Sequence, residues 1–167
     1  MTGHARGEPA AGGAGRDAAS GILRDGVHIY PVRVYFEDTD AAGIVYYANY
    51  LKFAERARTE MMRALGHAHS AIMRESGVAL SVRRCEAEYL LPARLDDLLE
   101  VRSQILELRG ASMWIEQQIR RGADDIARLV LRLAGLRPEG GPARFPAEVR
   151  AALAEFAAAD RPPVRGA

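Results

Sequence analysis

Residues 37–50 read Glu37-Asp38-Thr39-Asp40-Ala41-Ala42-Gly43-Ile44-Val45-Tyr46-Tyr47-Ala48-Asn49-Tyr50. The residues before them alternate as in a strand, with Val32, Val34 and Phe36 on one face, and a helix is expected to follow at once. Gly43 allows the sharp turn that must connect the two. The first N–H groups of a helix have no partner inside it and carry the positive end of its dipole, so they can stabilise an oxyanion beside an acid. The stretch therefore has the layout of a reaction site.

The helix predicted after this turn spans about residues 48–65, because apolar side chains recur there at helical spacing. Gly66 is the expected stop, and a shorter helix is predicted over residues 70–75. Four strands are expected next, over residues 78–91, 98–108, 112–120 and 126–136, followed by a short helix over residues 148–157. The pairs Arg109-Gly110 and Arg121-Gly122 are turn signals that favour antiparallel hairpins. This order predicts an α+β fold in which the long helix lies across one face of an antiparallel sheet.

The 167 residues, of which 49% are hydrophobic, suit one globular domain. Residues 1–25 are rich in Gly, Ala and Arg without hydrophobic periodicity, so we expect them to be disordered. The folded domain is expected over residues 26–140, and residues 141–167 are expected to form the short helix and a tail. The modest core and an open sheet edge also predict self-association.

The formal net charge of +1 gives no reason to expect nucleic acid as a partner. No apolar run has the length of a signal-peptide core or a membrane span, so a cytoplasmic location is expected. Cys85 is the single cysteine, which excludes an intrachain disulfide, and we expect it to be a small buried residue. His67 and His69 are expected on the surface, and too few ligands are present to predict a metal site.

Three ordered segments carry a resemblance to a known family: Pro31-Val32-Arg33-Val34-Tyr35-Phe36-Glu37-Asp38-Thr39-Asp40, then Glu55-Arg56-Ala57-Arg58-Thr59-Glu60, then Glu88-Tyr89 with Pro92-Ala93-Arg94-Leu95-Asp96-Asp97. They resemble the hotdog-fold acyl-CoA thioesterases of the 4-hydroxybenzoyl-CoA thioesterase type, and look closest to the YbgC branch associated with the Tol-Pal system. The resemblance runs from about residue 32 to about residue 137. It implies a hotdog fold, with a five-stranded antiparallel sheet wrapped around one long central helix, in a homodimer or homotetramer.

The same resemblance implies an acyl-CoA thioester hydrolase without a cofactor, since CoA is part of the substrate. By motif, Asp40 falls on the family's catalytic aspartate and is expected to act as nucleophile or general base. The backbone N–H of Tyr47 falls on the family's oxyanion donor. Substrate contacts are expected from the turn and the helix start, and arginines are candidates for the CoA phosphates: Gly43, Ile44, Val45, Tyr46 and Tyr50, with Arg83, Arg84 and Arg109.

Two acids of the long helix, Glu55 and Glu60, are alternatives by analogy with another hotdog branch. We rank them below Asp40, because ion pairs with Arg58 and Arg56 would explain them without chemistry. Asp38 is expected to support the turn rather than to react.

Two positions depart from the pattern of close relatives. Tyr47 stands where they often have a histidine, and Phe36 where they often have a tyrosine. A backbone donor survives the first change, so the mechanism is unaffected while the acyl preference stays open. A second function also stays open, in which the chain mainly binds acyl carrier protein or envelope lipid-synthesis enzymes, with weak hydrolysis.

Overall fold

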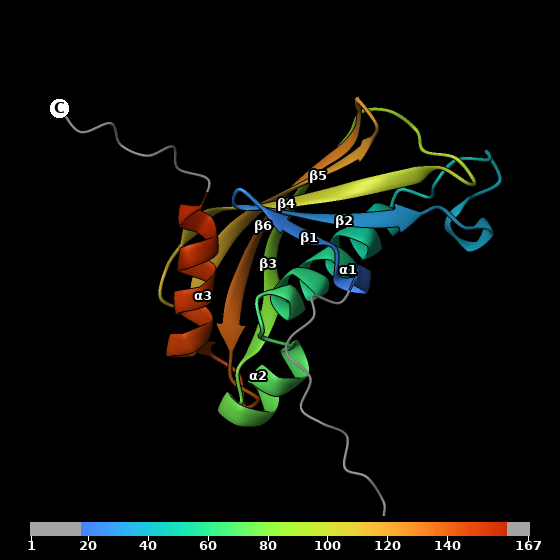
Figure 1. Ribbon diagram of the computed structural model, residues 1–167. Coiled ribbons are helices and arrows are strands. Elements are labelled where there is room, and N and C mark those ends of the chain that lie inside the picture. Colours follow the sequence, from blue (N-terminus) through green and yellow to red (C-terminus); the bar gives the residue numbers. More distant parts are fainter. Residues whose placement is uncertain (1–17, 160–167) are drawn as a thin grey trace, which may run out of the picture.

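The structure is a computed structural model that describes residues 18–159. Its antiparallel sheet has seven strands in the order β1-β2-β4-β5-β6-β3, with β7 paired to β6. Figure 1 shows the long helix α1 lying against one face of this curved sheet. The elements in chain order are η1 (Ala18–Ser20), β1 (Ile22–Arg24), β2 (Val27–Arg33), η2 (Phe36–Asp38), α1 (Asn49–Ala64), α2 (His69–Ser76), β3 (Ala79–Tyr89), β4 (Leu98–Leu108), β5 (Ser112–Arg121), β6 (Asp124–Leu136), β7 (Pro142–Ala143) and α3 (Ala147–Ala158).

The core lies between α1 and the sheet. Alternate residues of β5 and β6, such as Ile115, Ile119 and Leu131, are buried against α1. On α1, Phe53 and Met61 are fully buried at helical spacing. The predicted α+β arrangement is confirmed, because the period-two strands and the period-3.6 helix bury matching apolar faces.

The predicted hairpins are confirmed for β4, β5 and β6, which pair in sequence order. In contrast, β3 pairs with β6 and forms an edge of the sheet, so the segment between β3 and β4 crosses the end of the molecule. Cys85 lies on this edge strand and is exposed. The expectation that it is buried was therefore wrong, because strand propensity does not reveal which strand has an open side.

The strand expected through Phe36 ends earlier, at Arg33. Beyond it, Phe36 begins the 3₁₀ turn η2 and is 82% exposed. The turn forms because the Asp38 carboxylate accepts a hydrogen bond from the backbone N–H of Tyr35, at 2.9 Å. A local side-chain hydrogen bond of this kind competes with strand pairing, and hydrophobic alternation cannot detect it.

Both ends of the described chain belong to the fold. Residues 18–25 were expected to be disordered, but they form η1 and β1, and β1 pairs with β2. Residues 1–17, the rest of that prediction, lie outside the described residues. The helix α3 buries Val149, Leu153 and Phe156 in the same core as α1, so it is not an appendage to a domain that ends at residue 140. None of the helices within residues 18–159 has the length and hydropathy needed to span a bilayer.

Candidate active site

The loop of residues 39–47 leaves the end of β2 and leads into α1. Thr39 and Val45 form an isolated antiparallel bridge that closes it. Inside the bridge, the backbone N–H of Asp40 donates to the Ile44 carbonyl at 2.9 Å, and the Gly43 N–H donates to the Asp40 carbonyl at 2.9 Å. Gly43 has φ +72°, and no atom lies within 4 Å of the position a Cβ would take. The backbone conformation, rather than crowding, is therefore what favours glycine here.

The Asp40 side chain is exposed at the mouth of this loop. Its Oδ1 atom accepts a hydrogen bond from the backbone N–H of Ala42, at 2.8 Å. This contact orients the carboxylate and occupies only one of its two oxygens. The other oxygen accepts no hydrogen bond from the described residues, so the side chain is held in place and remains open to a reactant.

Asp38 has a different part in the site. It is only 5% exposed, and its carboxylate accepts the Tyr35 N–H. Its carbonyl accepts two more hydrogen bonds, from the Tyr46 N–H and from Nδ2 of Asn49, each at 2.9 Å. Asp38 thus ties the end of β2 to the start of α1, as expected of a supporting residue.

The start of α1 supplies unpaired N–H groups beside the loop. Ala48 is the N-cap residue and makes no side-chain cap. The Tyr46 and Asn49 N–H groups donate to carbonyls of Asp38 and Tyr46, whereas no backbone carbonyl within residues 18–159 accepts the Tyr47 N–H. The Tyr47 N–H is therefore available to an oxyanion at the positive end of the helix dipole.

Aromatic rings line the surface around this donor. The rings of Tyr46 and Tyr47 are 4.7 Å apart, and the Tyr47 ring meets that of Tyr89 edge-on at 6.2 Å. The hydrogen bond with Tyr47, followed by its nearby charge, raises the pKa of the Tyr46 phenol, and the Asp40 carboxylate adds a smaller rise. The Tyr46 phenol therefore remains a neutral donor at neutral pH.

The segment of residues 93–97 clamps the loop from the other side. The Ala93 carbonyl accepts the Val45 N–H at 2.8 Å, and the Ala93 N–H donates to the Tyr50 hydroxyl at 3.1 Å. Val34 exchanges two backbone hydrogen bonds with this segment: its N–H donates to the Asp97 carbonyl, and its carbonyl accepts the Asp96 N–H. The third segment of the sequence motif therefore supports the loop that carries Asp40.

An ion pair fixes the far end of this clamp. Asp97 accepts hydrogen bonds from the Arg94 N–H at 2.9 Å and from the Arg121 guanidinium at 2.8 Å. Partial burial opposes ionisation of Asp97, but the Arg94 hydrogen bond and the Arg121 charge outweigh it and lower the pKa of Asp97. The clamp thus holds a carboxylate that stays charged at neutral pH.

The residues expected to contact substrate divide into two groups. Gly43 and Tyr46 are exposed and Ile44 is half-buried, so the turn itself is accessible beside Asp40. Val45 and Tyr50 are 3% and 4% exposed and belong to the core. Burial raises the pKa of Tyr50, whose hydroxyl receives the Ala93 N–H. In this chain Val45 and Tyr50 therefore support the loop from below, because they pack against the clamp and α1.

The three arginines expected at the CoA phosphates lie away from Asp40 in this chain. Arg84 and Arg109 pair with Glu86 and Glu107, at 2.6 Å and 2.7 Å. At about 3.3 Å per strand residue, Arg109 lies roughly 35 Å along β4 from the end that meets the loop. Arg83 has no carboxylate partner within residues 18–159 and lines a surface cavity of about 330 Å³ with Arg132. One chain therefore does not bring these arginines to the acid.

The two acids of α1 considered above both have polar partners, but these are not the partners that the sequence predicted. Glu55 accepts the Thr59 hydroxyl at 2.9 Å, and Glu60 accepts the Ser20 hydroxyl and pairs with Arg63. The predicted partners differ because Arg56 lies over the Phe53 ring, at 5.3 Å.

Arg58, the other predicted partner, is 8% exposed and donates to Gln117 instead.

Within residues 18–159, no group of three or more His, Cys, Asp or Glu side chains has the arrangement of a metal site.

Sequence reasoning missed the supports of the site. Asn49 anchors the helix start to the Asp38 carbonyl, and Asp97 anchors the clamp to Arg121. A polar residue at the first position of an otherwise amphipathic helix was a usable signal for Asn49. Asp97 offered no local signal, because its partner lies 24 residues away in the chain.

Comparison with known proteins agrees with this geometry. Residues 34–153 match the family described as the Thioesterase-like superfamily. The acyl-CoA thioesterase YbgC of Haemophilus influenzae is 40% identical over 125 residues, which cover 74% of this chain and 92% of the relative. The acyl-CoA thioester hydrolase YbgC of Escherichia coli O157:H7 is 52% identical over 90 residues, which cover 54% of this chain and 66% of the relative.

Solved structures give the same result for the fold. A probable thioesterase from Bartonella henselae superposes with a TM-score of 0.69 at 35% identity, over 72% of this chain and 99% of that chain. A 1,4-dihydroxy-2-naphthoyl-CoA thioesterase from Synechocystis superposes with a TM-score of 0.73 at 23% identity, over 81% of this chain and 99% of that chain, which bears on the fold alone. The sequence match and the shared architecture together place the chain in the Thioesterase-like superfamily, as a YbgC-type thioesterase with the hotdog fold.

Proposed function

We propose that the protein hydrolyses acyl-CoA thioesters, with Asp40 as nucleophile or general base and the backbone N–H of Tyr47 as oxyanion donor. The observation that carries the proposal is the loop of residues 39–47. At one end it holds the exposed Asp40 carboxylate, of which only one oxygen accepts a hydrogen bond, and at the other end it holds an unpaired N–H at the helix start. The names of the Haemophilus and Escherichia relatives support acyl-CoA as the substrate class.

Hydrolysis follows one of two routes, which differ in the role of Asp40. As a general base, Asp40 takes a proton from water while the water oxygen attacks the thioester carbon, and CoA leaves as a thiolate. As a nucleophile, a carboxylate oxygen of Asp40 forms a mixed anhydride with the acyl group, CoA leaves, and water then cleaves the anhydride. In both routes the Tyr47 N–H stabilises the negative charge that develops on the carbonyl oxygen.

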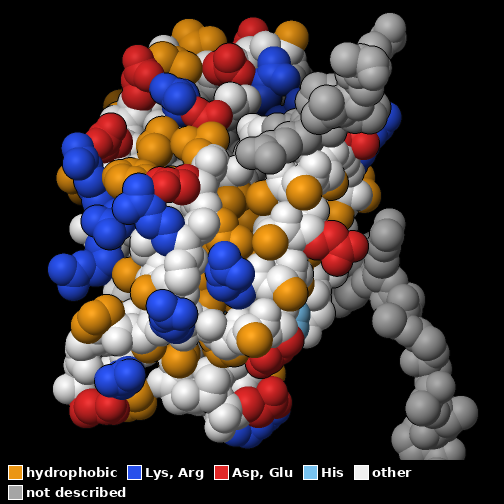
Figure 2. Space-filling model, turned by 90° about the vertical axis from the view of Figure 1, so that its left-hand side faces the viewer, with side chains coloured by type: hydrophobic (Ala, Val, Ile, Leu, Met, Phe, Trp, Pro, Cys, Tyr) orange, Lys and Arg blue, Asp and Glu red, His pale blue; other side chains and the backbone are white. Residues whose placement is uncertain are grey.

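A second copy of the chain is part of the proposal. Val82, Tyr89, Leu90 and Leu91 are exposed on and after the edge strand β3. Figure 2 shows hydrophobic side chains across the middle of one face of the molecule, with basic side chains gathered along one margin. A homodimer or homotetramer in the cytoplasm would cover such an edge, and Arg83 of a neighbouring copy would be available to a CoA phosphate.

The test uses short, long and aromatic acyl-CoAs with the full-length protein, whose mass in solution is measured alongside. We expect wild type to release CoA, and Asp40→Asn to reduce kcat by about 10²- to 10⁴-fold. Glu37→Gln is the matched control, because Glu37 is an exposed acid of the same segment. Equal rates for wild type and Asp40→Asn would refute the assigned chemistry. After a single turnover in H₂¹⁸O, ¹⁸O in Asp40 identifies the nucleophilic route, because it enters Asp40 only when water attacks the Asp40 carbon of a mixed anhydride.

A further inference from the structure

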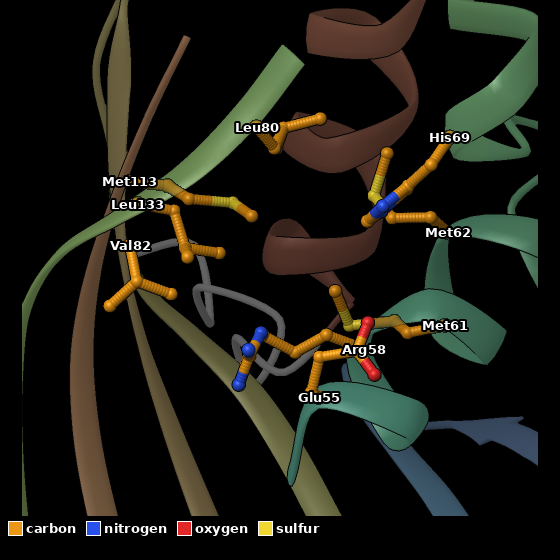
Figure 3. A pocket seen from close by; sticks show the side chains of 9 residues that line it. All are labelled: Glu55, Arg58, Met61, Met62, His69, Leu80, Val82, Met113 and Leu133. Carbon is orange, nitrogen blue, oxygen red and sulfur yellow. The ribbon is translucent and has the colours of Figure 1, made fainter. Parts of the chain in front are cut away.

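A cavity of about 140 Å³ lies between α1, α2 and the strands, apart from the Asp40 loop. Figure 3 shows its walls: Met61 and Met62 from α1, Met113 from β5, and aliphatic side chains from β3 and β6. Two groups that do not fit an apolar wall also line it, Arg58 and His69. A cavity of about 150 Å³ with aliphatic walls accommodates a benzene-sized molecule, so this one has room for about six heavy atoms.

Arg58 brings a buried positive charge to this cavity. Its Nη1 donates to Oε1 of Gln117 at 2.7 Å, and Gln117 is itself fixed by the Ala54 carbonyl and the Ser103 hydroxyl, both at 2.9 Å. These hydrogen bonds hold the guanidinium in one orientation. Arg58 forms no ion pair with a carboxylate of residues 18–159; burial lowers the pKa of its guanidinium, and the charge of Glu55 at the rim opposes this decrease. A buried charge without an ion-pair partner is costly, which makes the position favourable for an anion.

His69 adds a second polar group. Its Nε2 atom is buried and has no hydrogen-bond partner within the described chain. Burial lowers the pKa of His69, so the imidazole is neutral at neutral pH and repels neither anion nor cation. In Figure 3, His69 reaches the cavity from α2 beside Met62, while Arg58 extends from α1 towards the strands.

Among the described residues, Glu55 is the one acid that lines the cavity. Its side chain is exposed at the rim and accepts the Thr59 hydroxyl. Its charge opposes an anion, but solvent screens an exposed carboxylate far more than it screens the buried guanidinium. The interior of the cavity therefore remains a positively charged position with apolar walls.

We propose that this cavity binds the carboxylate end of a short aliphatic chain, with the carboxylate on Arg58 and the chain against the methionine and aliphatic walls. Such a group has two sources: a free short-chain carboxylic acid, or the terminal carboxylate of a dicarboxylic acyl group on CoA whose chain is long enough to reach from the reacting carbonyl to Arg58. Arg58 lies nine residues after Asn49, or roughly 14 Å along α1 at 1.5 Å per residue, so the site is separate from the reacting atoms. Binding of the free acid does not depend on the proposed hydrolysis, and the two can fail separately.

The methyl groups of the methionines that line the cavity allow ligand binding there to be measured directly. Three of the four methionines within residues 18–159 line the cavity, and the exposed Met73 lies outside it as an internal control. Wild-type protein with ¹³C-labelled methionine methyls is titrated with butanoate, which has six heavy atoms, and with butan-1-ol and butylamine. We expect saturable shifts of Met61, Met62 and Met113 with butanoate, binding at least about tenfold weaker for butanol, and none for butylammonium, because the carboxylate pairs its charge with Arg58, the hydroxyl accepts without a charge, and the ammonium has no acceptor. Equal affinity for butanoate and butanol, or no shift of these methyls, would overturn the proposal.

Variants test whether the anion binds to the Arg58 guanidinium. Arg58→Met should lower butanoate affinity by about tenfold or more, whereas Arg56→Met, which changes an exposed arginine over the Phe53 ring, should not. Glu55→Gln should tighten binding severalfold by removing the opposing charge. The wild-type ligand series remains decisive if Arg58→Met fails to fold.

The two sources of the carboxylate are then compared on active enzyme. Higher kcat/KM for a dicarboxylic acyl-CoA than for the monocarboxylic acyl-CoA of equal length, lost in Arg58→Met, identifies the substrate's own terminus. Inhibition by butanoate without that preference identifies the free acid. If no acyl-CoA is hydrolysed, the proposed function fails, while the methyl titration still decides the cavity.

Discussion

In the loop before α1, the Asp40 carboxylate is exposed, and the neighbouring backbone supplies its contact with Ala42. In the middle of α1, the Arg58 guanidinium is buried, and its position depends on the side chains of Gln117 and Ser103 and on the Ala54 carbonyl. The difference follows from solvation. An exposed charge needs only orientation, whereas a buried one needs hydrogen-bond partners to offset its desolvation. Changes at the loop should therefore affect activity first, and changes around Arg58 should affect stability first.

After the Asp40→Asn substitution, the largest effect is expected from removing the Tyr47 N–H. Tyr47→Pro lacks this donor and should lower kcat by about 10²- to 10³-fold, the range for loss of one oxyanion donor. Tyr47→Ala keeps the N–H and should retain most of the activity. Steady-state kinetics on both variants, with circular dichroism to confirm α1, make the comparison. Similar kcat values for the proline and alanine variants would remove the Tyr47 N–H from the mechanism.

The buried cluster should respond in the opposite way. Gln117→Met removes the acceptor of Arg58 and two donors, so the free energy of unfolding should fall by about 3 kcal/mol. Gln118→Met is the control, because Gln118 lies on the other face of β5 and makes only a 3.4 Å contact with Glu116. Urea denaturation measures both. If the two variants lose equal stability, the cluster around Arg58 does not have the structural role given to it here.

A smaller, pH-dependent effect is expected at the clamp. Because the folded state lowers the pKa of Asp97 below its ordinary 3.8, its contribution is present above that pH and is lost as the pH falls further. Asp97→Asn should cost about 1–2 kcal/mol at pH 7, and this cost should decrease as the pH falls below 3.8. Asp96→Asn, at the exposed neighbour, serves as control. A wild-type advantage over Asp97→Asn that does not decrease between pH 4 and pH 2 would contradict this assignment.

The helix over residues 48–65 and the strands over residues 98–136 were predicted within a few residues of their observed bounds. Their periodicities are local properties of the chain, so a reader of the sequence can detect them. Asp40 was selected because a motif joined it to Gly43 and a helix start. The role of Asp40 itself stays a prediction until the variants are measured.

The supports of the site could not be predicted in the same way. Ala93 holds Val45 across 48 residues, and Arg58 meets Gln117 across 59. Periodicity along the chain carries no information about which distant residues meet. The histidine expected on the surface, His69, lines a cavity for the same reason, since α2 folds back over α1 and β3.

By itself, the sequence determined the elements, the class of fold and the short stretch that joins an acid to a helix start, because each depends on neighbouring residues. The tertiary structure alone decided that β3 is an edge, that Val45 and Tyr50 support the loop from the core, and that residues 93–97 clamp it. It also decided that Arg58 is buried beside a cavity. These outcomes depend on contacts between residues far apart in the chain, which form only when the sheet closes over α1.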